Sequence, residues 1–169
     1  MRNFLKADSQ VRRMLLSQAG DKIGLSAKSI EKDLWVTQVL HALFSLDMSD
    51  KLIFKGGTSL SKAWGLIDRF SEDIDLAIDP VFLGAPNGDP TKKQIKKLRK
   101  ASSLYIAEEL AKKLSGRFAE LGLEEWLTVE AQPNGEGDNT YPEPRQIYVR
   151  YKSLYADDLQ YLLPIGRFA

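Results

Sequence analysis

Residues 55–62 read Lys-Gly-Gly-Thr-Ser-Leu-Ser-Lys, and residues 69–76 read Arg-Phe-Ser-Glu-Asp-Ile-Asp-Leu. The first segment follows a short apolar run, residues 51–55, which predicts a strand that ends in a tight glycine turn. In the second segment acidic and apolar residues alternate through residues 73–78, a pattern typical of a half-buried strand. No other part of the chain gathers so many reactive groups, so the fold and the function are interpreted outward from these two segments.

Asp73 and Asp75 are the candidate catalytic residues and metal ligands. Residues two apart on a strand project from the same face, so the two carboxylates lie side by side. Adjacent carboxylates repel each other, and a bound cation relieves that repulsion. Their hard oxygen atoms favour Mg²⁺ or Mn²⁺ over zinc. Such ions hold the attacking and leaving oxygens of a phosphoryl-type displacement.

The glycine turn predicts a phosphate-binding site. Gly56 and Gly57 allow backbone N–H groups to approach phosphate oxygens closely. We expect Thr58 or Ser59 to cap a short helix that runs to about Trp64, and the N-terminus of that helix also favours an anion. The turn, its hydroxyl groups and the helix start are therefore candidate contacts for a nucleoside triphosphate.

Two cations complete the predicted nucleotide site. Lys62 lies one turn into the short helix and Arg69 precedes the acidic strand, so both are candidates to neutralise the phosphates. A P-loop is excluded, because it requires Gly-x₄-Gly-Lys-Ser/Thr, whereas Gly56 is followed after four residues by Ser61, Lys62 and then Ala63. A Gly-Gly turn or an Asp-x-Asp pair alone is usually structural. Their combination within 20 residues indicates a triphosphate-and-metal site.

Periodicity predicts helices and strands on both sides of this centre. Helical spacing of apolar residues covers residues 8–19, 26–46 and 91–121, and residues 127–131 and 146–151 alternate as two strands of an antiparallel hairpin. The prediction is an α+β fold with a small mixed β-sheet flanked by helices. We expect one domain, 1–169, with a helical N-terminal segment, 1–48, and a sheet-containing core, 49–169.

Composition narrows the class of protein. The chain has 169 residues, 43% of them hydrophobic, enough for one core, and its net charge of +1 indicates neither an acidic nor a basic partner for the whole molecule. The absence of cysteine excludes disulfides and thiolate metal sites and fits a cytoplasmic protein. No apolar run reaches 18 residues, so no membrane-spanning helix is expected, and the charged N-terminus is not typical of a secretory signal.

Two further features have a structural and a functional interpretation. His41 is the only histidine and lies in a predicted helix, where a structural role is more common than metal binding. The helix that begins near residue 91 carries a cluster of basic side chains, which either forms a solvated face, the more common case, or contacts RNA phosphates in a salt-dependent manner. That cluster comprises Lys92, Lys93, Lys96, Lys97, Arg99 and Lys100.

The two central segments resemble a known family. Phe54–Lys62 and Arg69–Leu76 look like the nucleotidyltransferase-fold AbiEii/AbiGii toxins of bacterial type IV toxin–antitoxin and phage abortive-infection systems. Glu31–Trp35, with Val39 and Leu40, is similar to the N-terminal helical segment of that family. The resemblance covers roughly residues 28–80 well and the remainder loosely, and the pairing of the two central motifs makes it specific.

The resemblance implies a DNA-polymerase-β-like nucleotidyltransferase core. Gly56, Gly57 and Ser59 match the turn that holds the triphosphate, and Asp73 and Asp75 match the metal-binding pair. The implied activity is Mg²⁺-dependent transfer of a nucleotide from an NTP to an acceptor. The acceptor is an RNA, in some members the end of a tRNA, or a protein, and the implied partner is an antitoxin.

One departure from the family supports a second hypothesis. The fold normally supplies a third carboxylate from a later strand, followed by a C-terminal helical part, and this chain ends at Ala169, about where that strand is expected. Leu162–Ile165 would begin the strand, and Glu130 or the pair Asp157–Asp158 are the alternative carboxylates. The alternative to an active enzyme is therefore a shortened, catalytically inactive relative that binds a nucleotide, RNA or an antitoxin.

Overall fold

The structure, a computed structural model, describes residues 1–67, 73–86, 88–131, 146–155 and 160–165. The helices are α1 (Arg2–Lys6), α2 (Ser9–Ile23), α3 (Ala27–Leu43), α4 (Gly56–Lys62), α5 (Lys92–Leu104) and α6 (Ala111–Leu121), with a 3₁₀ turn η1 (Ser49–Lys51) and a π-helical turn η2 (Tyr105–Leu110). The strands are β1 (Leu52–Lys55), β2 (Asp75–Ile78), β3 (Leu127–Ala131), β4 (Ile147–Tyr151) and β5 (Gln160–Ile165).

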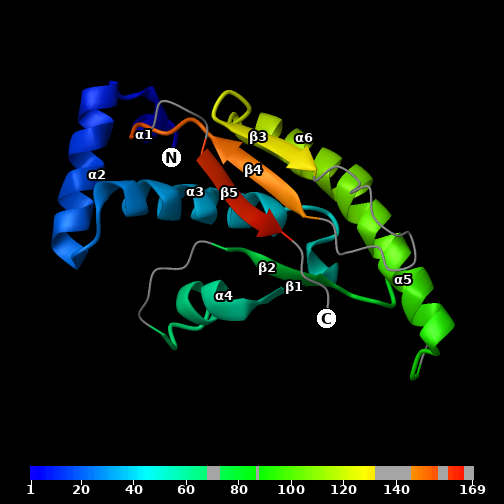
Figure 1. Ribbon diagram of the computed structural model, residues 1–169. Coiled ribbons are helices and arrows are strands. Elements are labelled where there is room, and N and C mark those ends of the chain that lie inside the picture. Colours follow the sequence, from blue (N-terminus) through cyan, green and yellow to red (C-terminus); the bar gives the residue numbers. More distant parts are fainter. Residues whose placement is uncertain (68–72, 87, 132–145, 156–159, 166–169) are drawn as a thin grey trace.

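The strands form two small antiparallel sheets. β1 pairs with β2, and β3, β4 and β5 follow one another in the second sheet, whose predicted β3–β4 hairpin is confirmed. β5 also contacts β2, so the two sheets lie next to each other (Figure 1). The predicted α+β class is confirmed, although every described strand pair is antiparallel and the expected single mixed sheet is replaced by two.

Helix α3 lies at the centre of the hydrophobic core. It contacts α2, α6 and β5, and in Figure 1 it runs across the middle of the molecule behind the three-stranded sheet. Five of its apolar residues recur at helical spacing and are at most 2% exposed: Trp35, Val36, Val39, Ala42 and Leu43. Both sheets and α6 add their apolar faces to the same core, which fixes β2 and its aspartates relative to α3.

The N-terminal helices differ from the predictions, and α3 covers Ala27–Leu43 of the predicted residues 26–46. Helix α2 is predicted to end at residue 19, but it continues through Gly20 and ends at Ile23, followed by Gly24 with φ 72°. A Cβ on Gly20 would lie 2.3 Å from the carbonyl oxygen of Leu25, so this glycine serves a close backbone contact rather than a helix break. The chain also begins with a short helix, α1, that the periodicity did not predict.

The long helical pattern predicted for residues 91–121 is confirmed, but it contains the π-helical turn η2. From η2 onward the apolar face is in the core, where Ile106, Leu110, Leu114 and Phe118 are at most 1% exposed. Before η2, the buried residues of α5 are Ser102 and Ser103, in its last turn. The N-terminal half of α5 therefore extends away from the core, at the outer end of the molecule in Figure 1.

In the described part of the chain, no helix combines the length and the apolar character needed to cross a membrane.

Candidate functional site

The two central segments meet at the end of the β1–β2 sheet. Lys55, the last residue of β1, pairs with Asp75, the first residue of β2. Ile74 and Leu76 are buried at 0% and 1% exposure, whereas Asp73 is exposed and Asp75 is half-buried. The predicted alternation is therefore confirmed, and it directs both aspartates away from the core.

Gly56 lies directly against the carboxylate of Asp75. A Cβ on this glycine would be 2.1 Å from Oδ2 of Asp75, and its φ of 77° is a conformation that residues with side chains rarely adopt. The structure thus brings the glycine turn and the acidic strand together, as the sequence predicted. Only glycine at this position allows the Asp75 carboxylate to lie against the backbone of the turn.

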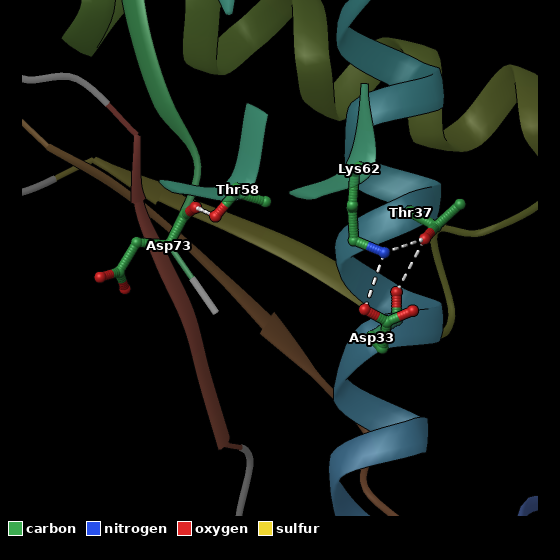
Figure 2. Close-up of polar contacts among 5 residues, drawn as sticks. All are labelled: Asp33, Thr37, Thr58, Lys62 and Asp73. Atoms are coloured by element: carbon green, nitrogen blue, oxygen red, sulfur yellow. Dashed lines mark hydrogen bonds and ion pairs between the residues drawn. The ribbon is translucent and has the colours of Figure 1, made fainter. Parts of the chain in front are cut away.

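The hydroxyl groups after the glycines donate hydrogen bonds to main-chain oxygens of the protein. Helix α4 begins at Gly56, so the prediction that Thr58 or Ser59 caps it is wrong. The buried Thr58 hydroxyl donates to the main-chain oxygen of Asp73, and Figure 2 shows the Asp73 carboxyl group pointing away from Thr58. The Ser59 hydroxyl donates to the Gly56 oxygen at 3.1 Å. Because Thr58 is tied to Asp73, it fixes the position of that residue relative to α4.

Lys62 faces helix α3. Its Nζ lies 2.7 Å from Oδ1 of Asp33 and 3.1 Å from Oγ1 of Thr37, whose hydroxyl donates to the main-chain oxygen of Asp33 (Figure 2). The sequence predicted that Lys62 neutralises a triphosphate, and the structure instead brings it together with two residues of α3. To reach a phosphate in the glycine turn, the ammonium group has to leave Asp33.

Lys55 is a cation that the sequence interpretation did not single out. Directly paired residues of antiparallel strands have Cβ atoms about 5 Å apart, so the register places Lys55 beside Asp75. The signal that could have indicated this was the pairing of the two strands predicted for residues 51–55 and 73–78. Arg69, the other predicted phosphate-binding cation, lies outside the described residues.

The structure describes only one of the candidates for a third carboxylate, Glu130. Glu130 on β3 is held by Arg150 on β4, with 2.6 Å between Oε2 and Nε, so its carboxylate forms a cross-strand ion pair. Strand β5, which contacts β2, has the sequence Gln-Tyr-Leu-Leu-Pro-Ile and carries no carboxylate. Asp157 and Asp158 lie outside the described residues. Over the ranges that the structure describes, no group of three or more His, Cys, Asp or Glu side chains could hold a metal.

Asp73 and Asp75 remain the candidate ligands of a hard divalent cation. Neither carboxylate forms an ion pair with a lysine or arginine in the described part of the chain, so their negative charge is not neutralised there. One is exposed and the other is half-buried next to the glycine turn. Oxygen donors with this accessibility suit Mg²⁺, which keeps several water ligands and is usually bound through one or two carboxylates together with substrate phosphates.

Glu31 is a buried carboxylate with a positioning role. It is 2% exposed, and it accepts hydrogen bonds from Ser153 Oγ at 2.6 Å and from the Leu154 amide at 2.7 Å. These bonds fix the segment after β4 against α3. Burial raises the pKa of the neighbouring Tyr155, and the Glu31 charge raises it further. The sequence interpretation missed this role, although Glu31 lies four residues before Trp35 on the apolar stripe of α3.

The only histidine does not join the site. His41 is exposed and, with Thr37, lines an open hollow of about 460 Å³ between α3 and the β1–α4 segment. The remaining lining residues are Leu40, Phe44, Phe54, Lys62 and Ala63. Neither aspartate nor the glycine turn lines this hollow, so it is separate from the candidate metal site.

Comparison with protein-family models decides the family. The model described as "Nucleotidyl transferase AbiEii toxin, Type IV TA system" matches residues 38–160, which include the glycine turn and both aspartates. The chain belongs to the AbiEii family. Its class is therefore a nucleotidyltransferase toxin, and membership of a type IV toxin–antitoxin family indicates an antitoxin partner. No curated protein and no solved structure matches this AbiEii chain.

Proposed function

We propose that this AbiEii-family chain is a Mg²⁺-dependent toxin that transfers a nucleotide from an NTP to an RNA acceptor in the cytoplasm. The observation that carries the proposal is the contact between Gly56 and Asp75 within the matched region. This contact places a glycine turn, whose backbone a phosphate can approach, beside the Asp75 carboxylate, which forms no ion pair with a lysine or arginine of the described residues. The lack of cysteine is consistent with the cytoplasmic location.

Asp73 and Asp75 would hold the Mg²⁺ or Mn²⁺ ion. When bound, the ion neutralises the phosphate oxygens and polarises the phosphoryl group that is transferred. The buried hydrogen bond from Thr58 fixes the backbone of Asp73, and the Gly56 contact fixes the side-chain position of Asp75. The chain thus provides the two oxygen ligands in positions set by α4 and by the β1–β2 register.

The glycine turn and its neighbouring cations would bind the triphosphate. In the proposal the Gly56–Gly57 backbone and Ser59 contact the phosphates. Support comes from Lys55, which pairs with Asp75 and adds a positive charge beside it. In the proposed reaction the oxygen of an acceptor hydroxyl forms a bond to the α-phosphorus. The bond from the α-phosphorus to the pyrophosphate breaks, pyrophosphate leaves, and the hydroxyl proton passes to water. Arg69 is a further proposed phosphate ligand.

A second candidate function is a catalytically inactive module that binds nucleotide, RNA or antitoxin. One observation favours it: Glu130 is committed to Arg150, and β5 carries no carboxylate next to β2. Under this alternative the aspartate pair and the glycine turn bind an NTP with its cation, but no nucleotide is transferred.

Label transfer separates the two candidates. The wild type is incubated with each α-³²P-labelled NTP, Mg²⁺ and total tRNA. The same assay is run on Asp73→Asn, on Asp75→Asn and, as a control, on Asp21→Asn, which removes a charge from an exposed site on α2. We expect label on RNA with the wild type and with the control, and a loss of at least 100-fold with either site variant. Mg²⁺-dependent NTP binding without transfer identifies the inactive module, and label on protein identifies a protein acceptor. Absence of both transfer and NTP binding overturns the proposal.

A further inference from the structure

Helix α5 concentrates positive charge to a degree that the rest of the molecule does not. Six of the chain's 24 basic residues fall within the nine positions 92–100, and α5 contains no acidic residue. Because the whole chain has 23 acidic residues, the part outside this segment carries more acidic than basic groups. The side chains of the segment's six basic residues are all exposed: Lys92, Lys93, Lys96, Lys97, Arg99 and Lys100.

This charge opposes the stability of the helix that carries it. Lys92 and Lys96, Lys93 and Lys97, and Lys96 and Lys100 are neighbours at i,i+4, where like charges repel. The lysines also occupy the first turns, where the helix dipole disfavours cations. A capping box in which Thr91 and Gln94 exchange hydrogen bonds holds the helix start in place.

Neither packing nor ion pairing within the described residues explains the six cations. None of them forms a salt bridge there, in contrast to Lys113 and Arg117 on α6, which pair with Asp47 and Glu120. The buried residues of α5 lie in its last turn, and the basic half extends beyond the core. A partner that brings negative charge would stabilise this extended, self-repelling row of cations, which the described residues leave unpaired.

We propose that the exposed basic face of α5 binds the phosphate backbone of an RNA, an inference that rests on the RNA acceptor of the proposed function. Phosphates require only point charges, which lysine provides, and five of the six cations are lysines. With one arginine in the segment, the contacts fix the position of the RNA without reading its bases.

The composition of α5 disfavours the other polyanions. A helix that lies on a membrane needs a broad apolar face with large side chains, and α5 has no aromatic residue. The centre of a protein interface is depleted of charge and enriched in aromatic residues, the opposite of this segment. Binding to an acidic membrane or to an acidic protein is the competing outcome of the test.

The test measures binding of a fluorescent RNA hairpin with a single-stranded 3′ end, by anisotropy between 50 and 200 mM salt, without nucleotide or divalent ions. The test variant is Lys93→Gln/Lys96→Gln/Lys97→Gln. The control is Lys6→Gln/Lys22→Gln/Lys28→Gln, which removes the same charge from exposed, unpaired lysines in the N-terminal helices. We expect the α5 variant to bind at least about tenfold more weakly and to reduce the slope of log K against log salt by about one per lysine, while the control matches the wild type.

The result is separable from the proposed catalysis. RNA binding is measured without nucleotide or divalent ions and therefore does not depend on transfer, so a failure of transfer does not remove the α5 result. Equal affinity and salt slope for the α5 variant and the wild type overturn the inference. It is also overturned if DNA of the same sequence binds more tightly than RNA, or if the α5 lysines support binding to phosphatidylserine vesicles or a poly-glutamate peptide but not to RNA.

Discussion

The carboxylate of Asp33 and the ammonium group of Lys62 lie 2.7 Å apart and join α3 to α4. Two segments that resemble the AbiEii family, Glu31–Trp35 and Phe54–Lys62, are therefore in direct contact in the fold. Since α4 begins with the glycine turn, the ion pair helps to fix that turn on the central helix of the core. Lys62 is consequently a positioning residue in this structure, in addition to any role with phosphate.

Removal of the Asp33–Lys62 pair should have a small and coupled effect on stability. Both side chains are partly exposed, so we expect Asp33→Asn and Lys62→Met each to lower the free energy of unfolding by about 0.5–1 kcal/mol, and the double variant to cost no more than the larger single change. Urea denaturation of the four proteins measures the coupling. Additive losses would show that the two side chains do not interact in solution.

The same variants also test the predicted phosphate role of Lys62. If its only function is to hold α4, Lys62→Met adds no further loss of NTP affinity in the Asp33→Asn background. A further loss of tenfold or more in that background would show that the ammonium group reaches the triphosphate.

Gly56→Ala should be far more damaging than a typical glycine-to-alanine change. The new methyl group would lie 2.1 Å from Asp75 Oδ2 on a backbone with φ 77°, so we expect a loss of more than about 1 kcal/mol in unfolding free energy and displacement of the carboxylate. The matched control is Gly116→Ala in α6, where a Cβ meets nothing within 4 Å and where alanine should stabilise by roughly 0.5–1 kcal/mol. Similar effects for the two variants would contradict the contact between the turn and Asp75.

Thr58→Val keeps the shape of a buried side chain and removes its hydrogen bond to Asp73. The carbonyl group of Asp73 then loses its donor from α4, and we expect a cost of about 1–3 kcal/mol in thermal or urea unfolding. Thr58→Ser keeps the hydroxyl and serves as the control, with a smaller loss from the missing methyl group. Equal losses for valine and serine would show that packing, and not the hydrogen bond, makes Thr58 necessary.

Lys93→Glu should separate the stability of α5 from its proposed function. The glutamate places a negative charge in the first turns and forms an i,i+4 pair with Lys97 in the favourable order, so we expect a gain of about 0.3–1 kcal/mol at low salt. Binding of the RNA hairpin should weaken at the same time. A variant that is less stable than the wild type at low salt would contradict the self-repulsion inferred for α5.

The local part of the fold and site was accessible from the sequence. Alternation over residues 73–78 and the Gly-Gly turn after a short apolar run are patterns set by neighbouring residues. Burial alternates as predicted from Asp73 to Ile78, but strand β2 begins only at Asp75 and the two glycines are the first residues of α4. Their contact depends on the antiparallel pairing of β1 with β2, which the sequence analysis did not specify. The register then placed Asp75 opposite Lys55, which no periodicity specifies in advance.

Long-range contacts account for most of what was missed. Glu31 is buried because it binds Ser153 and Leu154, more than 120 positions away, and Lys62 is directed to α3 by Asp33. Helix α4 begins at Gly56 with Lys55 at its N-cap, three or four residues earlier than a cap at Thr58 or Ser59 would place it, and the Thr58 hydroxyl binds Asp73 instead. Such partners depend on the tertiary arrangement. The local sequence indicates them only weakly, for example by an acidic residue on an apolar stripe.

The most direct test of the central claim is a calorimetric titration of each NTP in Mg²⁺ into the wild type and into Asp73→Asn/Asp75→Asn. The control, Asp21→Asn/Asp89→Asn, removes the same charge from two exposed aspartates elsewhere. The proposal predicts one Mg²⁺-dependent site in the wild type and in the control, and binding at least tenfold weaker, without Mg²⁺ dependence, in the site variant. Equal, Mg²⁺-dependent binding by the site variant and the wild type would contradict the assignment of the aspartate pair as the metal–nucleotide site.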